Sequence, residues 1–226
     1  MAEQRYVTLM ASLPYHGRLF GARQTPLSRF QLDKRLAWLE AEDAQALQRM
    51  ESILRWRKNL LLENDPQYLE EAKAIIDSLE HPLLAGIVRR RMEMRTLIAG
   101  LRMRAAGRSA PREREAWGFG RWVNVMRHHW SDPDFGLGHI FPWLNDAQRA
   151  MQEGNTLGLE RLFMGNAWDH LARSGAGHYF DFVAVAVYVL RWDLIDRWTR
   201  YEEEAAKKEI IGLADAGLGN YQQIYQ

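Results

Sequence analysis

Cysteine is absent from the 226 residues of this chain. Its absence excludes disulfide frameworks, thiolate zinc sites, iron–sulfur clusters and cysteine nucleophiles. Proline is scarce, at 7 residues, and no apolar stretch approaches the roughly 20 residues that a membrane-spanning helix needs. The amino terminus also lacks the apolar core of a signal peptide. We therefore expect a cytoplasmic protein without a membrane span, able to sit peripherally on the cytoplasmic face of the inner membrane.

An excess of charge of one sign is also missing, because 30 Lys and Arg residues balance 29 Asp and Glu residues. The net charge of +1 gives no overall field toward nucleic acid or anionic lipid. A nucleic-acid-binding helical module is therefore only a third interpretation, and nucleic acid is not an expected partner. The hydrophobic content of 47% and charged content of 26% are typical of a globular protein.

Apolar residues recur every three or four positions along most of the chain, which predicts helices. The predicted helices cover residues 27–40, 44–58, 66–81, 83–104, 112–130, 159–171 and 179–208. Residues 6–11 are rich in β-type residues, so we expect a short extended segment there. The stretch 183–190 alternates as a strand would, but its apolar spacing continues too far for a typical strand. The expected fold class is all-α: one packed multi-helix domain over 1–226 with a long C-terminal helix and a weak sub-boundary near 107–111.

One concentration of charge stands out on the predicted helix 83–104. Its members are arginines, namely Arg89, Arg90, Arg91, Arg95, Arg102 and Arg104. Guanidinium groups bind carboxylate and phosphate groups through paired hydrogen bonds, so these residues are a candidate docking surface for an acidic or phosphate-rich partner. The alternative is a solvated helix face, balanced by acidic segments such as 40–43.

A second constellation gathers imidazole and carboxylate groups, which suit zinc or non-haem iron. Its main members are His128, His129, Asp132 and His139, with Asp134, His170, His178 and Asp181 near or beyond them. No HExxH motif or i, i+4 histidine pair supports it, so a metal-dependent helical enzyme is the second interpretation. The structural alternative is a set of histidine and aromatic side chains that close a helix end.

Motifs of catalytic nucleophiles and of nucleotide-binding loops are missing. We therefore expect no catalytic residue and no cofactor. Nine tryptophans are many for this length; most are expected in the core and some as interface anchors.

Several segments together resemble a short bacterial family that accompanies V-type ATPases. They are ASLP (11–14), LIAGLRMRAAGR (97–108), FGLGHIFPWL (135–144) and GHYFDFVAVAVYVLRWDLIDRW (177–198). That family is distantly similar to the C-type central-stalk component of V-type ATP synthases, whose eukaryotic counterpart is designated d. The resemblance implies an all-helical, non-catalytic protein that couples the central stalk to the membrane rotor ring in ion transport, with the stalk and rotor subunits as partners.

Overall fold

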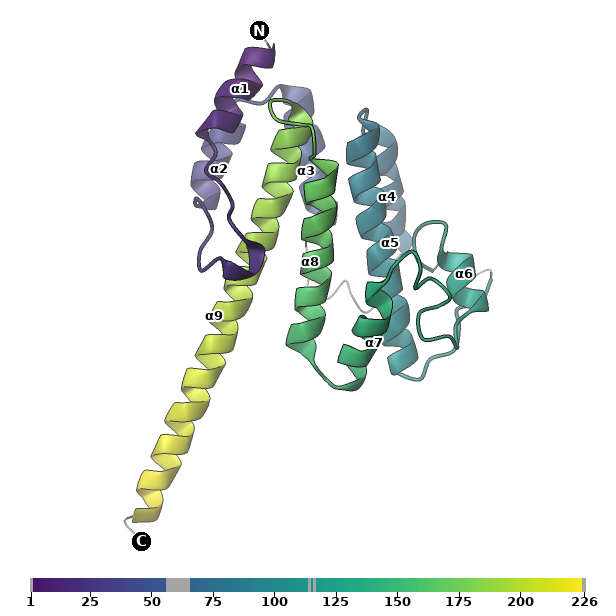
Figure 1. Ribbon diagram of the computed structural model, residues 1–226, viewed down its shortest axis with the longest axis vertical. Helices are drawn as coiled ribbons and strands as arrows, with labels where there is room; N and C mark the ends of the chain where they lie inside the picture. The colour runs from purple at the N-terminus through teal and green to yellow at the C-terminus, as the bar shows by residue number, and fades with distance from the viewer. Residues whose placement is uncertain (1, 56–65, 114, 116, 225–226) are drawn as a thin grey trace.

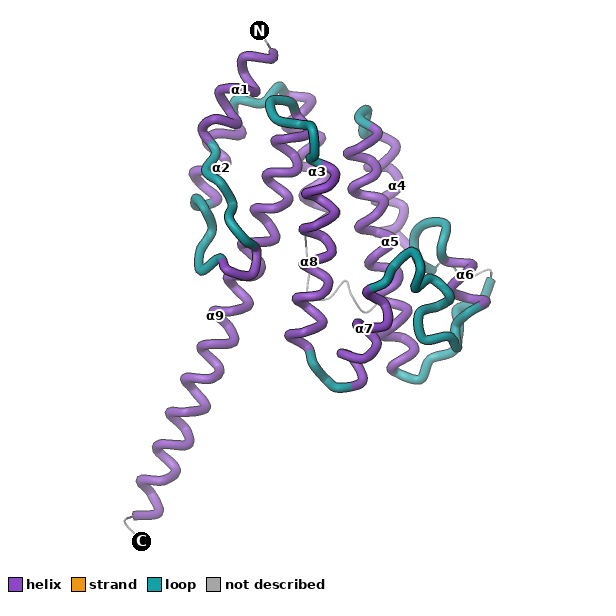
Figure 2. Tube along the Cα trace, viewed as in Figure 1, coloured by secondary structure: helices purple, strands orange, loops and turns teal. Residues whose placement is uncertain are grey.

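The fold consists of helices joined by loops, without a strand in the described residues (Figures 1 and 2). A computed structural model describes residues 2–55, 66–113, 115 and 117–224. The α-helices are α1 (Ala2–Ser12), α2 (Arg29–Leu36), α3 (Ala41–Leu54), α4 (Pro66–Ser78), α5 (Pro82–Ala105), α6 (Val123–His128), α7 (Trp143–Gln152), α8 (Thr156–Ser174) and α9 (Phe182–Ile224), and a 3₁₀ turn, η1, covers Leu19–Gly21. The predicted all-α fold class is confirmed.

Helix α5 forms the centre of the molecule, because α3, α4, α7, α8 and α9 all contact it. Its start follows from the sequence: the His81 side chain accepts a hydrogen bond from the Leu83 amide, and Pro82 occupies the first turn. Proline suits this position because its missing amide would have no helical partner there. All ten residues of α5 from 91 to 100 are buried, so neighbouring elements surround the helix over this stretch.

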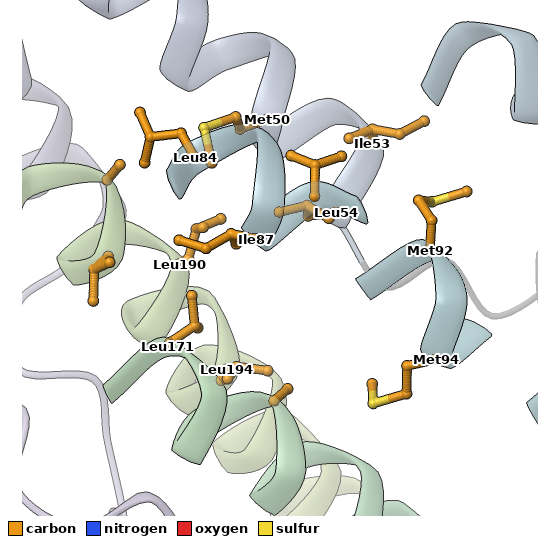
Figure 3. Packing of buried hydrophobic residues seen from close by; sticks show 14 of the residues in the cluster. Met50, Ile53, Leu54, Leu84, Ile87, Met92, Met94, Leu171, Leu190 and Leu194 are labelled. Atoms are coloured by element: carbon orange, nitrogen blue, oxygen red, sulfur yellow. The ribbon is translucent and has the colours of Figure 1, made fainter. Parts of the chain in front are cut away.

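The core is built where α3, α5, α8 and α9 meet (Figure 3). Leu54, Ile87, Leu171 and Leu190 contribute one side chain from each of these helices, and all four are buried. Residues from α1, α2, α4, α6 and α7 belong to the same apolar cluster. Burial of one such side chain stabilises a fold by about 1.5–3 kcal/mol, which holds the central helices together.

Residues 6–11 are helical, so the predicted extended segment is wrong. Tyr6 and Leu9, three positions apart, are both buried, and α1 packs on α2 and α9. The Tyr6 hydroxyl also donates a hydrogen bond to Asp43. Tertiary packing thus overrides the β preference of the Tyr, Val and Thr residues in this stretch.

The predicted helix 112–130 is wrong over its first half. Among the residues described there, α6 is the helical part, and turns precede it, with Gly118 and Gly120 at φ values of 75° and 91°. A Cβ atom at Gly120 would come within 2.7 Å of Glu93 on α5. Thr96 of α5 accepts a hydrogen bond from the Phe119 amide at 2.8 Å. The segment is therefore held as a close-packed loop against α5.

The other boundaries differ by smaller amounts. Helix α2 ends at Leu36, followed by a turn, and α3 begins at Ala41. Residues 56–58 of the predicted helix 44–58 lie outside the described residues. Helix α7 was not predicted, although Leu144 and Ala147 bury one of its faces. The predicted sub-boundary at 107–111 coincides with the end of α5, where Gly107 has a φ of 72°, and as a domain boundary it stays a prediction.

Helix α9 includes residues 183–190, which confirms the helical interpretation of the alternating stretch. These eight residues are all buried between neighbouring elements, which explains why the apolar pattern looks continuous. The C-terminal half of α9 projects beyond the body, and no other described element lies beside it (Figure 1). Within the described part of the chain, no helix has both the length and the apolar character of a membrane span.

Candidate functional site

The six arginines of α5 are distributed around the helix rather than over one exposed face. Arg89 is exposed, whereas Arg91 and Arg95 are buried, with exposed fractions of 9% and 7%. The Arg90 guanidinium lies 4.2 Å from the centre of the Phe141 ring. The folded protein therefore exposes little of the predicted docking surface, and Arg89 is its most accessible member.

Arg95 connects α5 to the C-terminal end of α3 through hydrogen bonds. Its guanidinium donates hydrogen bonds to the carbonyl oxygens of Ile53 (2.6 Å), Leu54 (3.0 Å) and Arg55 (2.9 Å). The last carbonyl groups of a helix lack partners within the helix, and a cation there also interacts favourably with the helix dipole. Arg95 therefore pairs with carbonyl groups at the end of α3, and it shares the Ile53 carbonyl with the Tyr68 hydroxyl, which donates to it at 2.6 Å.

Arg104 has a similar role at the other end of α5. Its guanidinium donates to the carbonyl oxygens of Trp130 (3.2 Å), Pro133 (2.6 Å) and Asp132 and lies 4.4 Å from the centre of the Phe135 ring. Burial lowers the pKa of Arg104, while Asp134 and Asp132 act to raise it. This arginine holds the loop after α6 in place.

Arg102 is half-buried beside Glu160 of α8. Burial lowers the pKa of Arg102, and the charge of Glu160 acts in the opposite direction. The Glu160 carboxylate also accepts a hydrogen bond from Arg197 Nε at 2.6 Å. Arg102 thus belongs to a charged cluster that joins α5, α8 and α9.

The alternative metal site is not assembled in the described residues, where no three His, Asp or Glu side chains are grouped to hold an ion. His129 Nδ1 lies 2.8 Å from Asp132 Oδ2, and His128 Nδ1 lies 2.7 Å from the Asn124 carbonyl oxygen. His139 is exposed. His178 pairs with Asp181 at 2.6 Å, at the start of α9. These pairs lie at helix ends and turns.

Four of the eight tryptophans in the described residues are buried, and a role of the others as interface anchors stays a prediction. Trp117, Trp143, Trp192 and Trp198 are buried, Trp122, Trp130 and Trp168 are half-buried, Trp38 is 50% exposed, and Trp56 lies outside the described residues. Other large apolar side chains are also exposed, notably Tyr15, Phe30, Tyr179 and Phe180.

A cavity with a volume of about 430 Å³ lies between α3, α5 and α9. Its wall carries many charged groups, namely Arg29, Arg55, Arg91, Arg197, Arg200, Asp193, Asp196 and Glu204. A second hollow of about 380 Å³ shares Arg29 and Arg55 with it and continues along α2 and α3. The two together form a charged groove along one side of the helical body.

Arg29 lies where the two hollows of this groove meet. It pairs with Glu51 of α3, with Nη2 donating to Oε2 at 3.1 Å, and with Asp33 one turn along α2, at 2.8 Å. Its Nη1 atom lies 3.8 Å from Asp193 Oδ1. The pKa of Asp193 is raised to about 7, mainly by burial and also by the charge of Glu51, against the opposing effect of Arg29. The groove therefore contains a carboxyl group that titrates near neutral pH.

This cluster was not predicted from the sequence, because Arg29, Glu51 and Asp193 are far apart along the chain. One signal was available: Asp193 follows a continuous apolar run on the C-terminal helix, in VAVAVYVLRWD. A carboxylate on an apolar helix face is rarely buried unless it is paired.

No protein-family model matches the chain, and no curated protein or solved structure is significantly similar to it.

Proposed function

We propose that this chain is a non-catalytic helical subunit or accessory protein of a V-type ATPase, which couples the central stalk to the membrane rotor ring. The sequence resemblance at 11–14, 97–108, 135–144 and 177–198 is the starting point. The structural observation that carries the proposal furthest is helix α9, which is anchored in the body and then projects away from it (Figure 1).

The anchored half of α9 is rigidly packed. Val183, Ile195 and Trp198 are buried, and the Trp192 indole donates a hydrogen bond of 2.9 Å to the Leu27 carbonyl oxygen. Tyr188 donates a second one, of 2.8 Å, to the Pro14 carbonyl oxygen. A helix held in this way can transmit force along its axis to the body.

The projecting half contains three glycines, Gly212, Gly217 and Gly219. Glycine costs a helix about 1 kcal/mol relative to alanine, and short helices without tertiary contacts are marginal in water. A helix of this composition gains stability from a partner that covers it, as a stalk subunit would. This makes the projecting half of α9 the first candidate for the contact with the complex.

Arg89 is a second candidate contact, because it is the exposed member of the α5 arginines. A surface arginine contributes to association mainly through long-range attraction, which salt screens. We therefore expect the contribution of Arg89 to partner binding to fall as ionic strength rises.

The test is purification of the tagged chain from its native membranes at low salt, followed by mass spectrometry of the proteins that accompany it. Four forms are compared: the full chain, a chain that ends at Glu204, Arg89→Glu, and Arg149→Glu as a control at an exposed arginine of α7. We expect stalk and rotor subunits with the full chain and the control, loss with the truncated chain, and salt-sensitive loss with Arg89→Glu. Thermal unfolding checks that the variants fold. Recovery of the folded full chain without ATPase subunits would overturn the proposal.

A further inference from the structure

A third, smaller cavity lies between α5 and α8, and Arg91 lines both this cavity and the charged groove. Its volume is about 30 Å³, and its polar wall consists of Arg90, Arg91, Arg173, His170 and Asn166. Phe141 and Trp143 close it with apolar surface. One water needs about 10–15 Å³ of such volume, so the enclosed space corresponds to about two waters, and a larger ion would extend toward the exposed side chain of Arg173.

The charges on this wall have one sign. Three guanidinium groups and an imidazole line the cavity, and none of the described residues around it is acidic. Burial lowers the pKa of Arg90, and the charges of Arg173 and Arg121 lower it further. Like charges that are close together and partly removed from water repel each other strongly. The wall therefore lacks a negative charge of its own that would balance it.

Glu93, one turn along α5, is the carboxylate whose charge acts on Arg90 in the opposite direction. It does not line the cavity. The pKa of Glu93 is raised by burial and lowered by Trp122, Arg121, Arg90 and Arg89, so this single carboxylate interacts with three arginines. It cannot neutralise Arg90 and Arg173 together.

His170 supplies a second, independent observation. Its Nε2 atom is buried and has no hydrogen-bond partner among the described residues. Burial lowers the pKa of His170 to about 4, and Arg90, Arg173 and Arg91 contribute to this decrease. The imidazole is thus neutral at physiological pH, and its unused ring nitrogen can carry the hydrogen that an anion accepts. Buried polar groups without partners are rare and usually have a ligand or water.

We propose that this cavity binds a small oxyanion of the phosphate class, held by the guanidinium groups of Arg90 and Arg173 and by His170 Nε2. The side chain of Arg173 is exposed, so it stands where the ion enters from solvent. Planar guanidinium groups pair bidentately with phosphate oxygens. The bound ion would supply the missing negative charge between α5 and α8. This inference is independent of the V-type ATPase proposal.

The first test is thermal unfolding of the full chain with increasing inorganic phosphate, at an ionic strength held constant with sodium chloride. Specific binding raises Tm along a saturable curve, by about 5–10 °C when phosphate reaches about 100 times its Kd. Arg173→Gln should abolish the saturable part, and Arg149→Gln, an exposed arginine on α7, should leave it unchanged. Equal curves for all three forms, or a rise that does not saturate, would overturn the proposal.

A second measurement follows the imidazole of His170 by NMR, with phosphate or methyl phosphate as the probe. A bound anion should move the pKa of His170 upward toward 6.5, because negative charge favours the imidazolium. A response to phosphate alone indicates an enclosed free ion, and a response to both probes indicates the phosphoryl group of a larger ester. No shift with either probe contradicts the site.

Discussion

Asp193 lies 3.8 Å from Arg29 in the charged groove, yet its carboxyl group is the weaker partner of that arginine. Glu51 accepts paired hydrogen bonds from the Arg29 guanidinium. The negative charge of Glu51 also disfavours ionisation of the nearby Asp193 carboxyl group. Burial is the main reason that the pKa of Asp193 rises to about 7. Three carboxyl groups, those of Glu51, Asp33 and Asp193, thus surround one guanidinium, and the raised pKa is that of Asp193.

This relationship predicts a specific dependence of stability on pH. The pKa of Asp193 is 3.8 in its ordinary state and about 7 in the folded protein, so the folded state binds more protons between these values. The favourable contribution of protonated Asp193 is therefore complete below about pH 4 and is lost as the pH rises toward 7. Asp193→Asn should remove this loss and raise the free energy of unfolding at pH 8 by a few kcal/mol, since each pKa unit corresponds to about 1.4 kcal/mol.

The measurement is chemical denaturation of both proteins from pH 4 to 8, with Asp146→Asn on α7 as an exposed control. His16 and His170 work in the opposite direction, because burial lowers the pKa of each to about 4, and their contribution makes stability rise between about pH 4 and 6.5. In Asp193→Asn the opposing titration of Asp193 is absent, so this rise in stability with pH should become visible. If the variant and the wild type keep parallel pH profiles, Asp193 does not titrate in this range.

Arg95 and Arg89 differ in role although both are on α5. Arg95→Ala removes three hydrogen bonds to the carbonyl oxygens that end α3 and leaves a void at a buried position. We expect a loss of about 2–4 kcal/mol in the free energy of unfolding, because the buried Leu54 carbonyl then loses this donor, while the Ile53 carbonyl keeps the Tyr68 hydroxyl. Arg89→Ala, at an exposed site, should change it by less than about 0.5 kcal/mol. Equal effects in urea denaturation would show that the two arginines are not distinguished by burial.

The sequence predicted the helices best where apolar spacing and end signals agree. The start of α4 at Pro66 and of α5 at Pro82 carried proline signals, and the apolar spacing of α9 decided between helix and strand. Residues 6–11 were misassigned because local β preference says nothing of Tyr6 and Leu9 packing on other helices. The loop before α6 was mistaken for helix for a similar reason. Gly118 and Gly120 lie close to Thr96 and Glu93, which are distant in sequence.

The arginine pattern was visible in the sequence, but its meaning was not. A charge on a helix is exposed or buried according to what surrounds the helix, and α5 is surrounded on all sides over 91–100. Periodicity could not reveal this, because five neighbouring helices supply the partners. The pairing of Arg29 with Glu51 and Asp193 was equally hidden, since it depends on the way α2, α3 and α9 meet.

Two glycines of α5 test the packing of this central helix directly. A Cβ atom at Gly86 would meet nothing within 4 Å, whereas one at Gly100 would lie 2.5 Å from the Met126 methyl carbon and 3.3 Å from the Phe135 ring. Alanine is favoured over glycine in a helix by about 1 kcal/mol, so Gly86→Ala should stabilise the protein by about that amount. At Gly100 the same gain is opposed by overpacking of a buried site, which costs about 1–3 kcal/mol.

We therefore expect Gly100→Ala to be less stable than Gly86→Ala by about 1–3 kcal/mol, measured by urea denaturation at one pH. The pair is matched because substitution, helix and propensity are the same and only the surroundings differ. When both substitutions are made in a Met126→Ala background, the difference between them should shrink, since the nearest obstructing atom is then removed. Equal stabilisation by both alanines would mean that α6 and the loop to Phe135 do not pack on α5 as closely as Met126 and Phe135 require.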